Sequence, residues 1–228
     1  MKRVFALILA AVMMLALAAC GDPAPAGSAP EEETVPSNGS NVQPDSSQAE
    51  QPEGNSHMLA AYFSLAGEQY DVGVIEEGNT SIIAHMIAEQ TGADLFEIEA
   101  VTPYPASHSE LLDVSRQEMA DNARPEIVDT VDNMDDYDTI FIGYPNWWGD
   151  MPMIVYSFLE SYDLSGKTIV PFCTHGGSGL SDTESTIADI TGGTMKDGFA
   201  ILGTTAQNDR DTARNEVTQW LREDGFIA

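Results

Sequence analysis

Residues 139–150 read Thr-Ile-Phe-Ile-Gly-Tyr-Pro-Asn-Trp-Trp-Gly-Asp, and this stretch decides the fold. Residues 139–144 are apolar almost throughout, without the polar alternation of a half-exposed strand, which is typical of a strand buried on both faces. A helical segment is expected to follow at about residues 152–161. Because strands buried on both faces occur in parallel sheets covered by helices, the stretch predicts an α/β fold.

The same succession of strand and helix continues outward from this stretch in both directions. Further strands are expected at residues 58–64, 95–98, 167–174 and 199–202, and further helices at 80–90, 110–121, 182–191 and 209–223. Five such strands predict a doubly wound, five-stranded parallel sheet with right-handed crossovers and helices on both faces. Ligands of these sheets bind at the carboxyl ends of the strands, so site residues are sought just after the first, third and fourth strands.

Composition excludes several classes of function. The chain carries 37 Asp and Glu against 9 Lys and Arg, a net charge of −28. Nucleic acids and anionic lipids are gripped through Lys and Arg, so neither is an expected partner. Cys20 and Cys173 are the two cysteines, too few for a disulfide framework or a thiolate zinc site, and no metal is predicted. Cys173 is expected to be a buried thiol of the fourth strand.

The first twenty residues are typical of a secretion signal. Lys2 and Arg3 precede an uncharged run over residues 4–19, which is short for a membrane span. The run ends in Leu-Ala-Ala-Cys-Gly (residues 17–21), which resembles the lipobox of bacterial lipoproteins. That resemblance implies lipidation at Cys20 and attachment to the outer side of the cell membrane by the lipid alone. The alternative is an ordinary cleaved signal with an incidental cysteine.

Residues 21–57 have the composition of a tether. They contain six Pro and seven acidic residues, with no basic residue and no Leu, Ile or aromatic side chain. Such a segment cannot bury enough apolar surface to offset its ordering entropy. The predicted organisation is therefore a signal (1–20), a disordered acidic tether (21–57) and one folded domain (58–228).

The loop after the first predicted strand has the features of an anion site. Ser64 ends the strand, and Gly78, Asn79, Thr80 and Ser81 open the following helix. Hydroxyls and unpaired backbone N–H groups at a helix N-terminus favour a phosphate through hydrogen bonds and the helix dipole. The alternative is that Thr80 merely caps the helix.

The loop after the third strand contains Pro145, Asn146, Trp147, Trp148 and Gly149. Two adjacent tryptophans on a strand would face opposite sides of the sheet, so a pair in a loop indicates a platform for a planar ring. The alternative places one tryptophan beneath the loop and the other at the start of the next helix.

The loop after the fourth strand is rich in glycine. Thr174, His175, Gly176 and Gly177 allow the backbone to approach a ligand closely, or simply form a flexible connection. Residues 176–180, Gly-Gly-Ser-Gly-Leu, nearly match a hydrolase nucleophile elbow around Ser178. The hydrolase alternative is disfavoured because all four histidines precede Ser178, whereas an α/β-hydrolase needs one after its nucleophile.

These three loops together resemble those of flavodoxins. The flavodoxin phosphate loop T-x-T-G-N-T is matched in pieces by Ser64, Gly78, Asn79 and Thr80, with residues 68–77 interrupting the motif. Residues 148–150 resemble the W-G-D motif of the second flavodoxin loop. The resemblance implies a flavodoxin-like sheet of strand order 2-1-3-4-5 that binds FMN without a covalent bond. Trp148 would then stack on the flavin and the Gly149 carbonyl would turn toward flavin N5.

The resemblance also implies roles for the other loop residues and a function. Phosphate contacts would come from the first loop, and ring contacts from the second and third: Ser64, Gly78, Asn79, Thr80 and Ser81, then Pro145, Asn146, Trp147, Trp148, Gly149, Thr174, His175, Gly176 and Gly177. The expected function is electron transfer with a redox partner protein or a quinone. One alternative is an NAD(P)H-dependent FMN or quinone oxidoreductase, and another is a non-catalytic surface lipoprotein that has lost the flavin.

Overall fold

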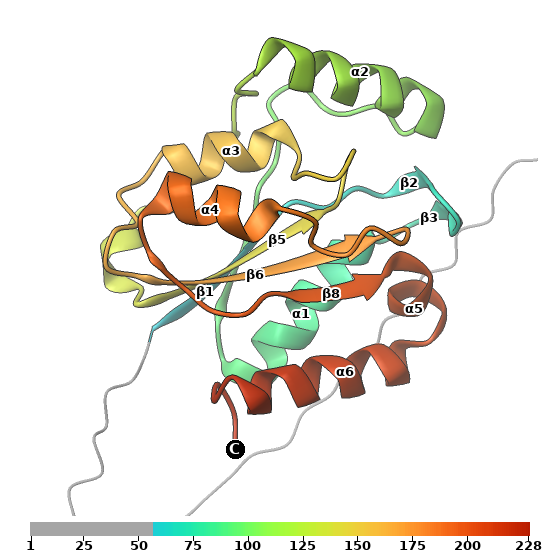
Figure 1. Ribbon diagram of the computed structural model, residues 1–228. Helices are drawn as coiled ribbons and strands as arrows, with labels where there is room; N and C mark the ends of the chain where they lie inside the picture. The colour runs from blue at the N-terminus through green and yellow to red at the C-terminus, as the bar shows by residue number, and fades with distance from the viewer. Residues whose placement is uncertain (1–56) are drawn as a thin grey trace, which may run out of the picture. The chain divides into compact units, whose positions relative to one another are not determined.

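The structure, a computed structural model, describes residues 57–228, which belong to one compact unit (Figure 1). The predicted signal, its Cys20 and the predicted tether up to residue 56 lie outside the described residues. Within residues 57–228, no helix combines the length and the apolar character needed to cross a membrane.

A parallel sheet forms the centre of the unit. Its main strands are β1 (Met58–Tyr62), β4 (Asp94–Glu97), β5 (Thr139–Pro145), β6 (Thr168–His175) and β8 (Phe199–Leu202). They are arranged as β4-β1-β5-β6-β8, which confirms the predicted order 2-1-3-4-5. A two-residue strand, β7 (Thr194–Met195), pairs with the start of β6, while β8 pairs with its end. The fifth position of the sheet is therefore occupied in two pieces.

Helices cover both faces of the sheet, as Figure 1 shows. On one face lie α1 (Asn79–Thr91), the short α5 (Gly203–Asn208) and α6 (Arg210–Glu223); on the other lie α3 (Met153–Glu160) and α4 (Thr183–Thr191). The helix α2 (His108–Asp121) lies beyond α3, and a 3₁₀ turn, η1 (Met134–Asp136), precedes β5. Each face of the sheet thus carries its own layer of core.

The central strand β5 explains why the fold depends on residues 139–145. Phe141 packs into the core on the α1 side, while Ile140 and Ile142 pack into the core on the α3 side. A side chain at Gly143 would collide with the ring of Phe172 in the neighbouring strand. The apolar run therefore supplies both layers at once, as its lack of alternation predicted.

Two features were not predicted from the sequence. The residues that interrupt the phosphate-loop motif form an antiparallel hairpin, β2 (Gly67–Gln69) and β3 (Gly73–Ile75). The last predicted helix is preceded by α5, and Asp209 separates the two with an extended φ of −140°. The Asp209 side chain accepts the N–H of Thr212 and so caps α6, which favours the break at this residue.

Candidate functional site

The two halves of the interrupted motif lie side by side at the N-terminus of α1. Ser64 Oγ accepts the N–H of Ser81 at 3.0 Å, which joins the end of the first strand to the first turn of the helix. A Cβ at Gly78 would collide with Ser64 Oγ and the Leu65 carbonyl, so only glycine allows this approach. The hairpin therefore leaves the loop and returns to it without separating the motif.

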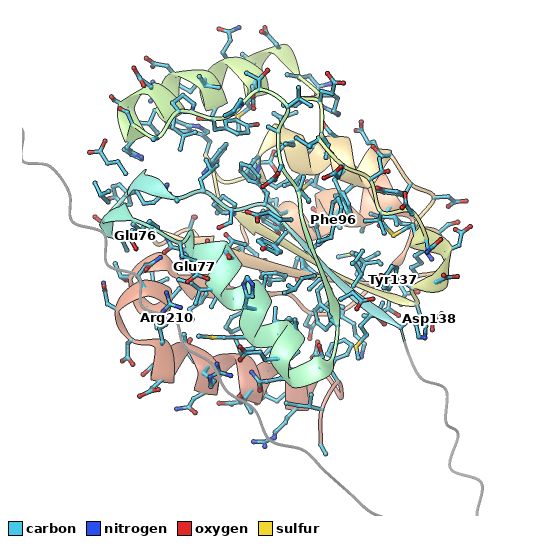
Figure 2. The ribbon with its side chains drawn as sticks, turned by 180° about the vertical axis from the view of Figure 1, so that it is seen from behind. Glu76, Glu77, Phe96, Tyr137, Asp138 and Arg210 are labelled. Carbon is cyan, nitrogen blue, oxygen red and sulfur yellow. The ribbon has the colours of Figure 1, made fainter. Side chains whose placement is uncertain are left out.

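The positive end of the α1 helix dipole lies at its N-terminus, where an anion could bind. Its first turn contains no acidic residue. Glu77, just before it, pairs with Arg210 Nη2 at 3.1 Å, and Figure 2 shows both side chains beside the start of the helix. Gln207 also donates to the Glu77 carbonyl at 2.6 Å. The exposed pair adds little stability, but Arg210 partly balances the Glu77 charge, while the other Glu77 oxygen accepts from Ser81 Oγ at 3.4 Å. With no acidic residue in the first turn itself, the helix end suits an anion.

Thr80 links this helix end to the loop after β6. Its side chain is buried, and its hydroxyl lies 2.8 Å from the hydroxyl of Thr174. Both hydroxyls therefore already have a partner. The bond fixes the first loop against the third. Thr80 therefore has a positioning role and not the helix-cap role that the sequence left open, because Gly78, and not Thr80, is the N-cap of α1.

The adjacent tryptophans have different surroundings. Trp147 packs edge to face against Phe63 and Tyr104, with ring centroids 5.6 Å apart in both pairs. Trp148 is 45% exposed. Trp147 thus matches the alternative in which one tryptophan lies beneath the loop, although Trp147 also lines the pocket described below.

Trp148 is held in a specific orientation by α2. Its backbone has a φ of 60°, which non-glycine residues adopt infrequently. The indole N–H donates to Ser115 Oγ at 3.0 Å, and the Arg116 guanidinium lies 4.3 Å from the ring centroid. These two contacts fix the ring despite its exposure.

Asn146 connects the second loop to the third. Its Oδ1 accepts the N–H of Gly149 at 3.0 Å, and its Nδ2 donates to the Gly179 carbonyl at 2.9 Å. Its own backbone N–H donates to the Thr174 carbonyl at 2.8 Å. The two loops therefore form one hydrogen-bonded unit at the carboxyl ends of β5 and β6.

The third loop is shaped by His175. Its Nδ1 accepts the N–H of Gly177 at 2.9 Å, and burial lowers the pKa of the imidazole, which favours the neutral ring that this bond requires. The ring thus serves loop geometry instead of pairing with Ser178, which agrees with rejecting a hydrolase. Cys173 below it is a buried free thiol, as predicted, with a pKa raised to about 12 by burial.

A pocket of about 490 Å³ opens between these loops. Eight of the residues that the sequence selected line it: Asn79, Pro145, Asn146, Trp147, Trp148, Thr174, His175 and Gly176. The other selected residues lie behind this lining. Three of them contact it directly, Thr80 through Thr174, Gly149 through Asn146 and Gly177 through His175. Ser64, Gly78 and Ser81 form the joined phosphate-loop motif at the start of α1.

Sequence reasoning missed the rest of the lining. It comes from the hairpin, from α2 and from the segment after β8: Gln69, Tyr70, Asp71, His108, Leu111, Leu112, Ser115, Arg116, Leu202, Gly203 and Thr204. For α2 a signal existed, because its lining residues follow the spacing i, i+3, i+4, i+7 and i+8 of one helix face. The hairpin carried no comparable signal.

The lining fits a molecule that combines a planar ring with an anionic group. The volume lies within the roughly 300–1,000 Å³ typical of small-molecule sites. Asn79 Oδ1 is buried without a hydrogen-bond partner in the described protein atoms, although Asn79 lines the pocket, so it is placed to accept from a ligand. Residues 57–228 contain no cluster of His, Cys, Asp and Glu that could hold a metal ion.

Comparisons with known proteins agree with this geometry. The model of a flavodoxin family matches residues 57–223. A candidate flavoprotein from Bacteroides eggerthii is 30% identical, with a TM-score of 0.60, over 75% of this chain and 98% of that protein. A second one, from Bacteroides uniformis, is also 30% identical, with a TM-score of 0.59, over 73% and 98%. None of the curated proteins compared with the chain matches it.

A more distant structure shares the fold alone. It is a flavoprotein from Lactobacillus acidophilus in complex with FMN, 22% identical with a TM-score of 0.51, covering 66% of this chain and 95% of that one. The family match spans the described sheet and all of its helices, including the joined phosphate-loop motif and the adjacent Trp147 and Trp148. The chain therefore belongs to the flavodoxin family, through a domain at residues 57–223.

Proposed function

We propose that this protein binds FMN in the pocket at the carboxyl ends of β1, β5 and β6 and transfers electrons. The observation that carries the proposal is the joined motif of Ser64 and Gly78 at the N-terminus of α1, next to a pocket bordered by Trp148. FMN is the cofactor because the chain is a flavodoxin and the Lactobacillus relative was crystallised with it.

The residues present divide the work of holding FMN. The backbone N–H groups at the start of α1 would bind the phosphate, with Ser64 and Ser81 shaping the loop around it. Asn79 Oδ1 would accept a hydrogen bond from the cofactor, and Trp148 would present its ring to the flavin. When bound, the flavin supplies reversible uptake of electrons, and the protein supplies position, stacking and electric field.

The acidic charge of the protein affects this reaction in two ways. A net charge of −28 disfavours added negative charge on a reduced cofactor, which lowers its reduction potential. The same field attracts a basic redox partner and raises its rate of encounter. A carrier that exchanges electrons with a basic protein or with a quinone is therefore the primary proposal.

An NAD(P)H-dependent FMN or quinone oxidoreductase is the second candidate. One observation favours it: the pocket extends past the loops to α2, which leaves lining residues such as Leu112 and Arg116 remote from the phosphate-loop motif. Additional lining of this kind suits a second substrate beside the cofactor. Oxidation of NADPH by the FMN-loaded protein with a quinone as acceptor distinguishes a reductase from a carrier, which reacts slowly with NADPH.

The location of the protein is part of the proposal. A lipid at Cys20 would hold the flavodoxin domain outside the cell membrane, at the end of the tether at residues 21–57. Labelling of cells with a radioactive fatty acid tests this directly. We expect label on the wild-type protein and none on the Cys20→Ala variant, and equal label on both would contradict the anchor.

The experiment that tests the cofactor is a visible absorption spectrum. The purified protein is incubated with FMN and desalted, and we expect it to retain about one flavin per chain. A colourless protein would overturn the proposal and favour the non-catalytic lipoprotein alternative.

A further inference from the structure

The pocket has two walls of different origin. The inner wall consists of the strand ends and adjoining loops, represented by Asn79, Thr174 and Gly203. We call the opposite side the outer wall; its residues come from the hairpin and α2 and are Tyr70, His108, Leu111, Leu112, Ser115 and Arg116. The inner wall carries the proposed FMN contacts, whereas the outer wall contributes to them only through Ser115 and Arg116, which orient Trp148.

The outer wall is built on one face of α2. Its five helical members, from His108 to Arg116, follow a single stripe with the spacing of helix neighbours. Leu111 and Leu112 lie in the middle of this stripe and make it apolar. Of the whole helix, only Leu111 and Ser115 are buried, so α2 gives much of its inward face to the pocket instead of to the protein core.

The hairpin is attached to the beginning of α2. The N–H of Glu68 donates to the Ala106 carbonyl at 2.8 Å, and the Glu68 carboxylate accepts the N–H of His108 at 3.1 Å. Gly67, with a φ of 96°, allows this approach, because a Cβ there would lie 2.8 Å from the Ala106 carbonyl oxygen. These contacts place the tip of the hairpin, with Tyr70, at the pocket.

Tyr70 and Trp148 mark the two ends of the outer wall. The Tyr70 ring lies 6.2 Å from the ring of His108 and against the backbone of Gly176. Trp148 contacts Ser115 and Arg116, seven and eight residues further along α2. That separation corresponds to about 10–12 Å along the helix axis. An apolar strip of this length, with an aromatic ring at each end, matches a flat molecule of two or three fused rings.

Arg116 gives the outer wall a positive charge that is not hydrogen-bonded to an oxygen of the described residues. The other six basic side chains of residues 58–228 each donate to a carboxylate or a carbonyl oxygen: Arg124, Lys167, Lys196, Arg210, Arg214 and Arg222. Within the described residues, Arg116 has no such oxygen partner, and its guanidinium lies 4.3 Å from the centroid of the Trp148 ring. Its guanidinium N–H groups thus remain available for an anion at the pocket.

We propose that the outer wall binds the second redox substrate, and that this substrate is a flat, largely apolar molecule of the quinone type with a carboxylate or similar anionic group. The rings lie along Leu111 and Leu112 between Tyr70 and Trp148, and the anionic group pairs with Arg116. This inference rests on the proposed function, because the substrate exchanges electrons with FMN held at the inner wall.

The test uses two probes with the same rings and different charge, anthraquinone-2-carboxylate and the neutral anthraquinone-2-carboxamide. Each is titrated into the FMN-loaded protein at pH 7.5 by calorimetry, with quenching of tryptophan fluorescence as a second readout. The acidic domain repels anions in general, so tighter binding of the carboxylate requires a local cation. We expect the carboxylate to bind about tenfold more tightly than the carboxamide, as for one well-placed charge-assisted pair.

Two variants assign the preference to Arg116. In Arg116→Gln the preference should disappear, because carboxylate affinity should fall while carboxamide affinity stays within about twofold of wild type. The matched control Arg222→Gln removes the same charge at the far end of α6, where Arg222 donates to the Ala228 carbonyl, and should keep the preference. In a third variant, Tyr70→Ala, both probes should bind several-fold more weakly, because stacking does not depend on the charge of the probe.

The results separate this inference from the proposed function. Absence of carboxylate preference in the wild-type protein, or an unchanged preference in Arg116→Gln, overturns the substrate assignment. If the protein retains no FMN, the proposed function fails, yet titration of the probes into the apoprotein still shows whether Arg116 selects the anion. Retention of FMN together with the preference supports both.

Discussion

The helices α1 and α2 both supply residues to the pocket, but they are held in place in opposite ways. Six residues of α1 are buried, and the helix packs against the sheet, α5 and α6. Only two residues of α2 are buried, and the helix is held by contacts such as those from Glu68 to His108 at its start and from Trp148 to Ser115 in its middle. The pocket thus has one wall that is part of the core and one that rests on it.

This difference indicates how freely the residues of each wall can move or be substituted. The N-terminus of α1 cannot move without disturbing the core, which suits a site that must hold a phosphate in one geometry. Apart from the buried Leu111 and Ser115, the outer wall can alter its side chains with little cost to folding, which suits the side of the pocket that selects a substrate. Substitutions on the two helices should therefore differ in their effects on stability and on binding.

The largest effect is on stability and compares one residue from each helix. Ile83 of α1 is fully buried, so Ile83→Ala should lower the free energy of unfolding by about 3–4 kcal/mol, as other large-to-small core changes do. Leu112→Ala on α2 should cost less than about 1 kcal/mol, because Leu112 is only partly buried. Urea denaturation of the two apoproteins measures both values. Equal losses of unfolding free energy would contradict the distinction between α1, which belongs to the core, and α2, which rests on it.

The second prediction concerns the charge at the start of α1. Asn79→Asp changes shape little but adds a negative charge in the first turn, where none is present. We expect FMN affinity to fall at least a hundredfold, because like charges within a few ångströms repel by several kcal/mol. Fluorescence titration with FMN gives the affinity. The control Ser109→Asp adds the same charge at an exposed position of α2 and should change affinity less than about twofold.

The third prediction separates the adjacent tryptophans. Trp148→Ala should weaken FMN binding about tenfold or more, by analogy with the 1–3 kcal/mol measured for base stacking on aromatic side chains. Its effect on folding should be small, since the ring is 45% exposed. Trp147→Ala should instead lower stability by about 2–3 kcal/mol, because its ring packs against Phe63 and Tyr104. Unchanged FMN affinity in Trp148→Ala would remove the stacking role.

The tryptophans also show why part of the site could be predicted from the sequence. The order of the strands followed from apolar runs such as residues 139–145, because burial on both faces leaves a continuous pattern. That order brought the loops after β1, β5 and β6 to one edge, so residues as distant as Asn79 and His175 could be assigned to one pocket. Which of Trp147 and Trp148 would face outward depended on the positive φ of Trp148, which has no sequence signature in a non-glycine residue.

The outer wall could not be predicted for a different reason. The spacing of His108, Leu111, Leu112 and Ser115 indicates an amphipathic helix, and such a stripe ordinarily faces the core. Its position at the pocket depends on the hairpin at residues 67–75, which appeared in the sequence only as an interruption of a motif. Two short strands closed by residues with positive φ, among them Asp71 and Gly73, give too few apolar positions for a strand pattern. Only tertiary contacts reveal what they do.

The smallest expected effect comes from the pH dependence of the third loop. Burial lowers the pKa of His175 below its ordinary value, whereas in the unfolded chain the imidazole titrates near about 6.5. Above that pH the His175 imidazole is neutral in both the folded and the unfolded chain, and its contribution to stability is fully present. As the pH falls from about 6.5 through the folded-state pKa, the unfolded chain takes up the proton first, so stability decreases.

The bond from the Gly177 N–H to Nδ1 of His175 is lost when that nitrogen is protonated. We therefore expect an NMR titration midpoint for His175 below 6.5, and a loss of stability below that pH that is absent in His175→Gln. A midpoint above 6.5 would mean that a negative charge near the ring outweighs its burial, and the loop would then gain stability on acidification.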